Sequence, residues 1–184
     1  MKNNTNKLIS LLKNRVVVLF LLATSFSFSQ GVFDKFQDNE DINSMIVSKK
    51  LFDLMSNVKV DLKDKEMNQY VTLLKKLENL KVFSTNSTTA STEMKFAVSS
   101  YLKSNPLEEL MRVNSDEKNV KIYVKSGKND QVVEELLMFV DGDNNQQQTI
   151  LLSIIGTFNL DELSTLTEKL KIPGGKNLGK TIKK

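Results

Sequence analysis

Apolar residues recur every three or four positions in three stretches of the chain, which is the spacing of one buried helical face. The positions on these faces are Leu51, Leu54 and Met55, then Met67, Tyr70, Val71, Leu74 and Leu77, and finally Met94, Ala97, Val98, Tyr101 and Leu102. Ser48 and Asp64 are N-cap residues for the first two helices, and Pro106 stops the third. The run Thr85 to Thr92 predicts a loop, because it is rich in Ser, Thr and Asn.

Five further segments have the apolar pattern of strands. Residues 44–47 and 80–84 are short apolar runs, and residues 120–124 alternate between apolar and polar side chains. Residues 136–140 and 150–155 are apolar throughout, which predicts central strands, and the chain after residue 107 should form an antiparallel meander. The pattern therefore predicts an α+β fold, with an antiparallel-rich sheet of about five to six strands and about three to four helices packed mainly on one face.

A last helix is predicted from its capping residues. Asn159 is a cap, Glu162 stands close to the position of a capping box, and Phe158 can pack against Leu163. Pro173-Gly174-Gly175 ends this helix.

The first 29 residues have the three parts of a secretory signal peptide. A basic, polar stretch over residues 2–15 precedes an apolar run at 16–23, and small residues, among them Ser27 and Ser29, follow. An uncleaved membrane anchor is the rival interpretation, but the apolar run is shorter than the roughly 20 residues that span a bilayer. No Cys follows the run, so the chain is not a lipoprotein. We expect an exported protein, periplasmic or extracellular, with no transmembrane segment in the mature chain.

Four parts follow from these boundaries: the signal peptide at 1–29, an acidic N-terminal segment at 30–43, a single α+β domain at 44–172 and a flexible basic tail at 173–184. Residues 31–172 hold 18 basic and 22 acidic residues, so this part of the chain is mildly acidic. The net charge of the whole chain is +4 because the two ends hold only basic charged residues. A mildly acidic body does not suit nucleic acid. The tail could make weak contact with an anionic membrane surface, but its composition favours a solvated segment.

The composition excludes several kinds of chemistry. The chain has no His and no Cys, so Ser-His-Asp and Cys-His nucleophiles and zinc sites built on sulfur are impossible. No phosphate-binding loop or dinucleotide fingerprint occurs. We therefore expect no catalytic residues, no cofactor and no enzymatic activity.

Two acidic groups could hold a cation. The loop Asp141-Gly142-Asp143-Asn144-Asn145 resembles the start of a calcium loop, but Gln146 and Leu152 stand where an EF-hand needs Gly and Glu. A hairpin turn explains it better. The acidic residues Asp34, Asp38, Glu40 and Asp41 are better explained as a solvated segment. No metal site is predicted.

The two strands that are apolar on both sides are the least usual feature. A sheet with helices on one face should have one solvated face. Either a helix covers the second face and the strands are ordinary core, or that face is an interaction surface or a lipid-binding cleft. For the second case the candidate residues are Leu137, Phe139, Leu151 and Ile155.

Several segments resemble a family of exported Bacteroidetes proteins known as domain of unknown function 4252. The opening segment 44–55, the strand at 80–85, the strand at 134–140 and the closing segment 154–163 carry the resemblance. It covers the chain from about Phe33 to Ile172 and implies export and an α+β fold. The family has no catalytic residues that could be carried over.

Two functions are compatible with these observations. The first is a non-enzymatic envelope domain that binds another envelope protein or associates with itself. The second is a carrier of a lipid or another apolar ligand, with the doubly apolar strands as the wall of its cleft.

Overall fold

The computed structural model describes residues 31–57, 64–115, 118–129, 131–142 and 148–162. The chain divides into two compact units, Met1–Asp34 and Lys35–Lys184, and every helix and strand from β1 onward lies in the second. The 3₁₀ helix η2 (Asp34–Phe36) spans the boundary. The elements that follow are β1 (Asn43–Ser48), α2 (Lys49–Ser56), α3 (Lys65–Lys76), β2 (Leu77–Thr85), α4 (Thr88–Ser104), β3 (Glu108–Ser115), β4 (Lys118–Ser126), β5 (Val132–Asp141), β6 (Thr149–Asn159) and the 3₁₀ helix η3 (Leu160–Glu162).

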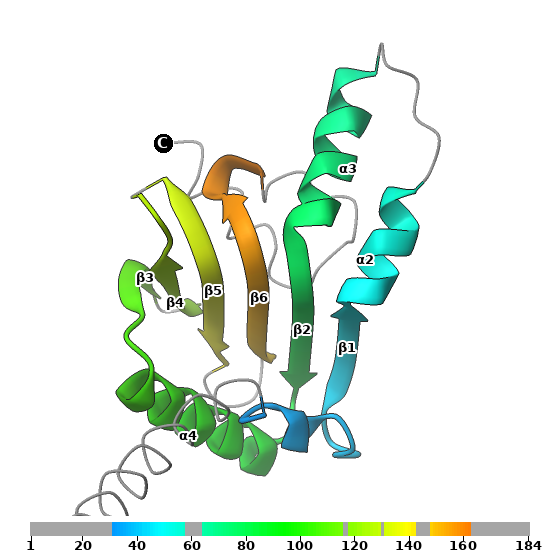
Figure 1. Ribbon diagram of the computed structural model, residues 1–184. Helices are drawn as coiled ribbons and strands as arrows, with labels where there is room; N and C mark the ends of the chain where they lie inside the picture. The colour runs from blue at the N-terminus through cyan, green and yellow to red at the C-terminus, as the bar shows by residue number, and fades with distance from the viewer. Residues whose placement is uncertain (1–30, 58–63, 116–117, 130, 143–147, 163–184) are drawn as a thin grey trace, which may run out of the picture. The chain divides into compact units, whose positions relative to one another are not determined.

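The six strands form one sheet in the order β1-β2-β6-β5-β4-β3, and every neighbouring pair is antiparallel (Figure 1). The last four strands follow one another as a meander, and β6 pairs with β2. The edges of the sheet are β1 and β3. The predicted α+β fold with an antiparallel sheet is confirmed.

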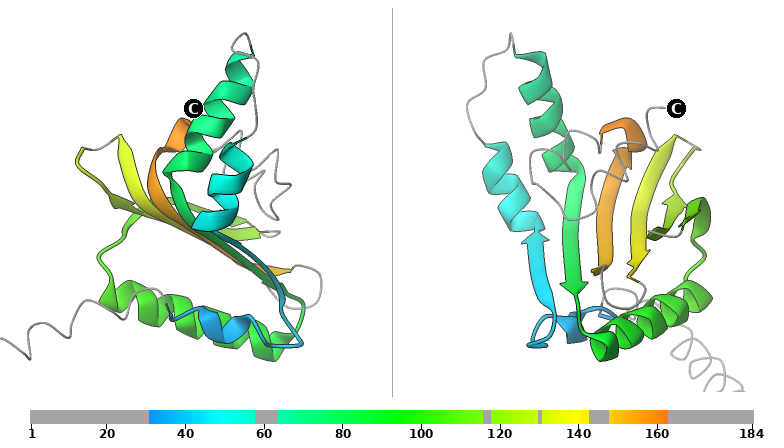
Figure 2. Two further views of the ribbon diagram at one scale, coloured as in Figure 1. Left: turned by 45° about the vertical axis from the view of Figure 1, so that its right-hand side comes forward. Right: turned by 180° about the vertical axis from the view of Figure 1, so that it is seen from behind.

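Helices lie on both faces of this sheet (Figure 2). Phe52 of α2 and Leu74 of α3 share one core cluster with sheet residues such as Leu136 and Ile154. On the opposite face lies α4, whose buried Tyr101 donates a hydrogen bond to a β5 side chain. Of the three α-helices in the described residues, two thus share one face, as expected, and the third covers the other. This third helix explains why β5 and β6 are apolar on both sides.

Side-chain caps define where α3 and α4 begin. The Asp64 carboxylate accepts a hydrogen bond from the Met67 N–H at 2.9 Å, as the sequence predicts for the start of α3. The Ser87 hydroxyl accepts one from the Ala90 N–H at 3.4 Å. Helix α4 therefore begins at Thr88 and β2 ends at Thr85, so the prediction of a loop from Thr85 to Thr92 holds only for Asn86 and Ser87 and is wrong for the rest. A good cap outweighed the low helix propensity of the Thr and Ser residues that follow it.

The prediction for α2 is right about the helix and about Met55, which packs against the core, and wrong about the two leucines of its buried face. Phe52 is fully buried, whereas Leu51 and Leu54 are exposed. Ser48 occupies the N-cap position, but its side chain makes no capping hydrogen bond. Tertiary packing against α3 and β2 selects the buried face, because eight residues are too few for periodicity to fix it.

Gly156 permits a close approach between β6 and the junction of α3 and β2. It lies opposite Leu77, and a Cβ atom on Gly156 would lie 2.5 Å from the Lys76 carbonyl oxygen and 2.8 Å from the Leu77 Cα atom. The backbone φ of 158° also favours glycine. The register between β2 and β6 shifts at the same place, between Leu77 and Asn79. Only a residue without a side chain fits there.

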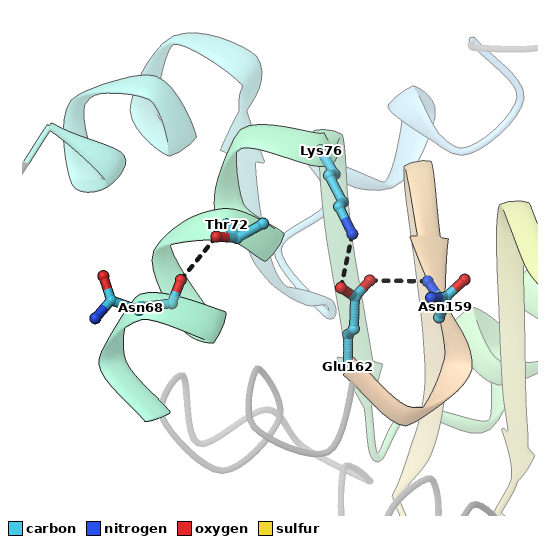
Figure 3. Close-up of polar contacts among 5 residues, drawn as sticks. All are labelled: Asn68, Thr72, Lys76, Asn159 and Glu162. Atoms are coloured by element: carbon cyan, nitrogen blue, oxygen red, sulfur yellow. Dashed lines mark hydrogen bonds and ion pairs between the residues drawn. The ribbon is translucent and has the colours of Figure 1, made fainter. Parts of the chain in front are cut away.

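The last described residues tie the end of β6 to α3 (Figure 3). Glu162 Oε2 accepts a hydrogen bond from the Asn159 N–H at 2.9 Å, which is the reciprocal bond of the predicted capping box. Glu162 Oε1 lies 2.7 Å from Lys76 Nζ. The rest of the predicted final helix, the predicted signal peptide and the predicted tail lie outside the described residues.

Candidate functional site

Strand β1 is an open edge of the sheet. It pairs with β2 over all six residues without a break, from Asn43 opposite Ser84 to Ser48 opposite Asn79. In the described part of the chain no strand pairs with its outer side. An edge strand leaves a row of backbone N–H and C=O groups unpaired, so it is a template on which another strand can form.

The side chains of β1 do not protect this edge. None of its six residues is charged. Val47 is buried against the core, but Ile46, whose side chain points to the opposite face, is 37% exposed. Charged residues are a common means of keeping an edge strand from pairing with other chains. That means is missing in β1.

Helix α2 follows directly at the end of β1 (Figure 1) and carries two exposed leucines. Leu51 and Leu54 lie three residues apart and therefore on one side of the helix; they are 43% and 61% exposed. We refer to the outer side of β1 together with Ile46, Leu51 and Leu54 as the β1–α2 surface.

Opposite charges flank this surface. Asp38, Glu40 and Asp41 precede β1 and are exposed, and Lys49 and Lys50 follow it and are also exposed. Lys49 Nζ lies 3.2 Å from the Asp53 carboxylate, so part of its charge is already balanced within α2. The uncharged strand thus runs from an acidic to a basic end.

The other edge strand, β3, is built differently. It carries Glu108, Glu109 and Arg112 among its eight residues. Arg112 Nε donates to Glu109 Oε1 at 2.9 Å, and this hydrogen bond lowers the pKa of Glu109 below its usual value. Leu110 has no register partner on β4, because the pairing shifts between Glu109 and Met111. Charges and a bulge are two ways in which proteins block an edge.

One ionisable group with a shifted pKa, Glu135, lies inside the sheet and not on this surface. Glu135 of β5 is only 7% exposed, and its carboxylate accepts a hydrogen bond of 2.6 Å from the Tyr101 hydroxyl. Burial raises the pKa of Glu135, although the Tyr101 bond and the charge of Lys125 oppose the shift. Since both Tyr101 and Glu135 are buried, the pair joins α4 to β5 and does not present a reactive group to a substrate.

The residues predicted for an interaction surface lie in the core. Leu137, Phe139 and Leu151 are buried and Ile155 is half-buried, on the face of the sheet that α4 covers. Phe139 lies directly opposite Leu151, while Leu137 and Ile155 lie opposite other residues. Because α4 covers these residues, they do not form a free surface. The candidate surface is instead the one formed by β1 and α2.

The candidate cation sites gain no support from the structure. Strand β5 ends at Asp141 and its antiparallel neighbour β6 begins at Thr149, and residues 143–147 between them lie outside the description. Asp141 Oδ2 lies 2.9 Å from Lys95 Nζ. Across the described ranges, no three Asp, Glu, His or Cys side chains come together as metal ligands would.

A family model described as "Domain of unknown function (DUF4252)" matches residues 36–166. The chain belongs to this family. No curated protein and no solved structure matches it. The match includes both edges of the sheet and all of α2, α3 and α4, so the β1–α2 surface is part of the DUF4252 domain. In the part of the domain that the structure describes, no helix has both the length and the apolar character needed to cross a membrane.

Sequence reasoning missed the β1–α2 surface of this DUF4252 domain. A signal was present: an uncharged run, Asn43 to Ser48, stands between an acidic and a basic segment. That pattern indicates an uncharged strand with an acidic segment before it and a basic segment after it. It does not reveal that the strand lies at an edge of the sheet.

Proposed function

We propose that this DUF4252 protein is exported, is not an enzyme, and binds another protein through the β1–α2 surface. The observation that supports this most directly is the open, uncharged edge of β1. Ile46 on the strand, and Leu51 and Leu54 on the helix that follows it, are exposed apolar side chains that a partner could bury. Addition of a strand to an exposed sheet edge is a recurrent mode of protein recognition.

The free energy gained from such contacts is large enough to offset the cost of association. Each backbone hydrogen bond made by an added strand contributes about 1 kcal/mol net. Complete burial of a fully exposed leucine or isoleucine is worth about 1.5–3 kcal/mol, and side chains that are 37–61% exposed, as these three are, would gain roughly half of it. Three such side chains and a six-residue strand can therefore offset the several kcal/mol that association costs in lost freedom.

Export and the lack of enzymatic activity rest on separate observations. The three-part pattern of residues 1–29 supports export. The absence of His and Cys from the sequence, and the burial of the Tyr101–Glu135 pair, support a protein that works by binding.

The alternative, a carrier of an apolar ligand, has less support. It depended on a cleft wall formed by Leu137, Phe139, Leu151 and Ile155, and the first three of these are buried on the α4 side of the sheet.

Photo-crosslinking in the native host tests the proposed surface. A photoreactive amino acid is placed singly at Ile46, at Leu54 or at Phe96, which is 71% exposed on α4 and serves as the matched control. We expect crosslinked products from the first two positions and none of comparable yield from Phe96. Products of equal yield at all three positions, or none at Ile46 and Leu54, would overturn the proposed function.

A further inference from the structure

We infer that the partner of the β1–α2 surface is a second copy of this chain, whose β1 pairs with the first in the antiparallel direction. This inference rests on the proposed function and names the occupant of the same surface. The six-stranded sheets of the two copies would then form one continuous antiparallel sheet across the seam.

The charge pattern around β1 is complementary to itself. Asp38, Glu40 and Asp41 lie before the strand, Lys49 and Lys50 lie after it, and all five are exposed. Antiparallel pairing of two copies puts the acidic end of each strand beside the basic end of the other. Parallel pairing would place like charges together, which is unfavourable.

Symmetry and face parity restrict the register to an axis that passes through a residue of β1, and we place this axis at Ile46 because its side chain is apolar and exposed. A two-fold axis perpendicular to the sheet keeps both faces continuous, so directly opposite residues must come from the same face. An axis at Ile46 satisfies this condition and pairs Ile46 with Ile46 of the second copy. Met45 then lies opposite Val47, and Ser44 opposite Ser48. The exposed isoleucine of each copy becomes part of a β-branched cross-strand pair at the centre of the seam.

The same register brings the charged segments together. Lys49 Nζ is already bonded to Asp53 and to the Lys75 carbonyl oxygen, at 3.2 and 3.0 Å. We therefore assign the main attraction to the exposed Lys50 and to Glu40 of the second copy. The two-fold axis makes this contact twice.

Single cysteines test the register directly, because the chain has no cysteine of its own. Residues directly opposite in an antiparallel pair have Cα atoms about 4.5–5.5 Å apart, which a disulfide can bridge. In the full chain, Ile46→Cys should form a disulfide-linked dimer under mild oxidation. Phe96→Cys, also exposed, is the control and should stay largely monomeric on a denaturing gel.

Charge reversal tests the complementarity. Glu40→Lys and Lys50→Glu should each weaken self-association by at least about tenfold, because each places two like-charged contacts across the seam. An equimolar mixture of the two variants should recover association, since the reversed charges face each other in the mixed pair. Light scattering of the full chain, with one variant carrying a mass tag, measures both effects.

The outcomes separate this inference from the proposed function. A dimer with crosslinks at position 46 and rescue by the mixture supports both. A monomeric full chain, or a dimer without the Ile46→Cys crosslink, overturns self-pairing through β1. If Ile46 and Leu54 still photo-crosslink to a different protein, the proposed function stands and only its partner changes.

Discussion

The two edge strands of the DUF4252 sheet differ in their charges and in the regularity of their backbone pairing. Strand β1 has six uncharged residues in unbroken register with β2. Strand β3 has three charged residues, an ion pair between Glu109 and Arg112, and a bulge at Leu110. Both have an exposed apolar side chain, Ile46 at 37% and Val113 at 39%. Apolar exposure therefore does not distinguish the edges; the difference lies in the backbone and the charges, and it marks β1 as the edge that can accept a strand.

The largest effect on stability is expected at the pairing of β2 with β6. This pairing joins the half of the sheet that carries β1 to the half that carries β3. The change Gly156→Ala would place a Cβ atom 2.5 Å from the Lys76 carbonyl oxygen, so β2 and β6 would have to separate. We expect a loss of about 3 kcal/mol or more in the free energy of unfolding. Urea denaturation followed by circular dichroism measures it. A loss below about 0.5 kcal/mol, the usual size for a surface site, would show that the contact relaxes freely.

The next effect compares the edges directly. Ile46→Lys should abolish self-association, because it places two like charges at the centre of the β1 seam. Val113→Lys on β3 is the matched control, since the two side chains are equally exposed, and it should leave the solution mass unchanged. Light scattering of both variants at one concentration decides the result. Equal losses in the two variants would contradict the difference between the edges.

A smaller effect tests the sheet interior, away from both edges. Burial raises the pKa of Glu135 above its usual 4.5, so the folded protein holds this proton more tightly than the unfolded chain does. Stability from this group is therefore present at low pH and falls as the pH rises from about 4.5 through the raised pKa.

Glu135→Gln should remove this pH dependence and stabilise the protein at neutral pH, because the amide can still accept the Tyr101 hydrogen bond. Thermal unfolding from pH 4 to pH 8 provides the measurement. Self-association should not change. A variant less stable than the wild type at pH 8 would mean that the charged carboxylate is stabilising after all.

The smallest effect is expected from removing the protection of β3. In the double variant Glu109→Thr and Arg112→Thr the edge loses its ion pair but keeps its bulge. We expect almost no change in stability, because both side chains are exposed. Slow formation of species larger than a dimer should appear at high concentration. Sedimentation velocity detects it, and its absence would assign the protection of β3 to the bulge and the remaining charge of Glu108.

Local signals in the sequence were sufficient for much of the fold. The Asp64 cap and a twelve-residue amphipathic pattern predict α3, and the alternation at Val120, Ile122 and Val124 predicts β4. The doubly apolar strands are central, as expected. In α2, where only eight residues carry the pattern, the buried face was partly misassigned, since Phe52 and not Leu51 faces the core.

The candidate site could not be predicted in the same way. Whether β1 is an edge depends on β2 and β6 pairing in space, and no local pattern carries that information. The covering of the second face likewise depends on where α4 packs, so Leu137 and Phe139 could be equally well core or surface until the strand order was known.

The pairing of β2 with β6 also has a consequence for how the protein reaches its folded state. Val82 lies opposite Leu152, so the central seam joins residues about 70 positions apart, and contacts so distant in the chain form slowly. A chain delivered from its N-terminus would expose the β1–β2 pair, with both long sides unpaired, until β6 arrived. Pairing of the exposed side of β2 with another chain during that interval would compete with completion of the sheet. Ordered folding would then require that β6 dock on β2 before a second chain comes within reach.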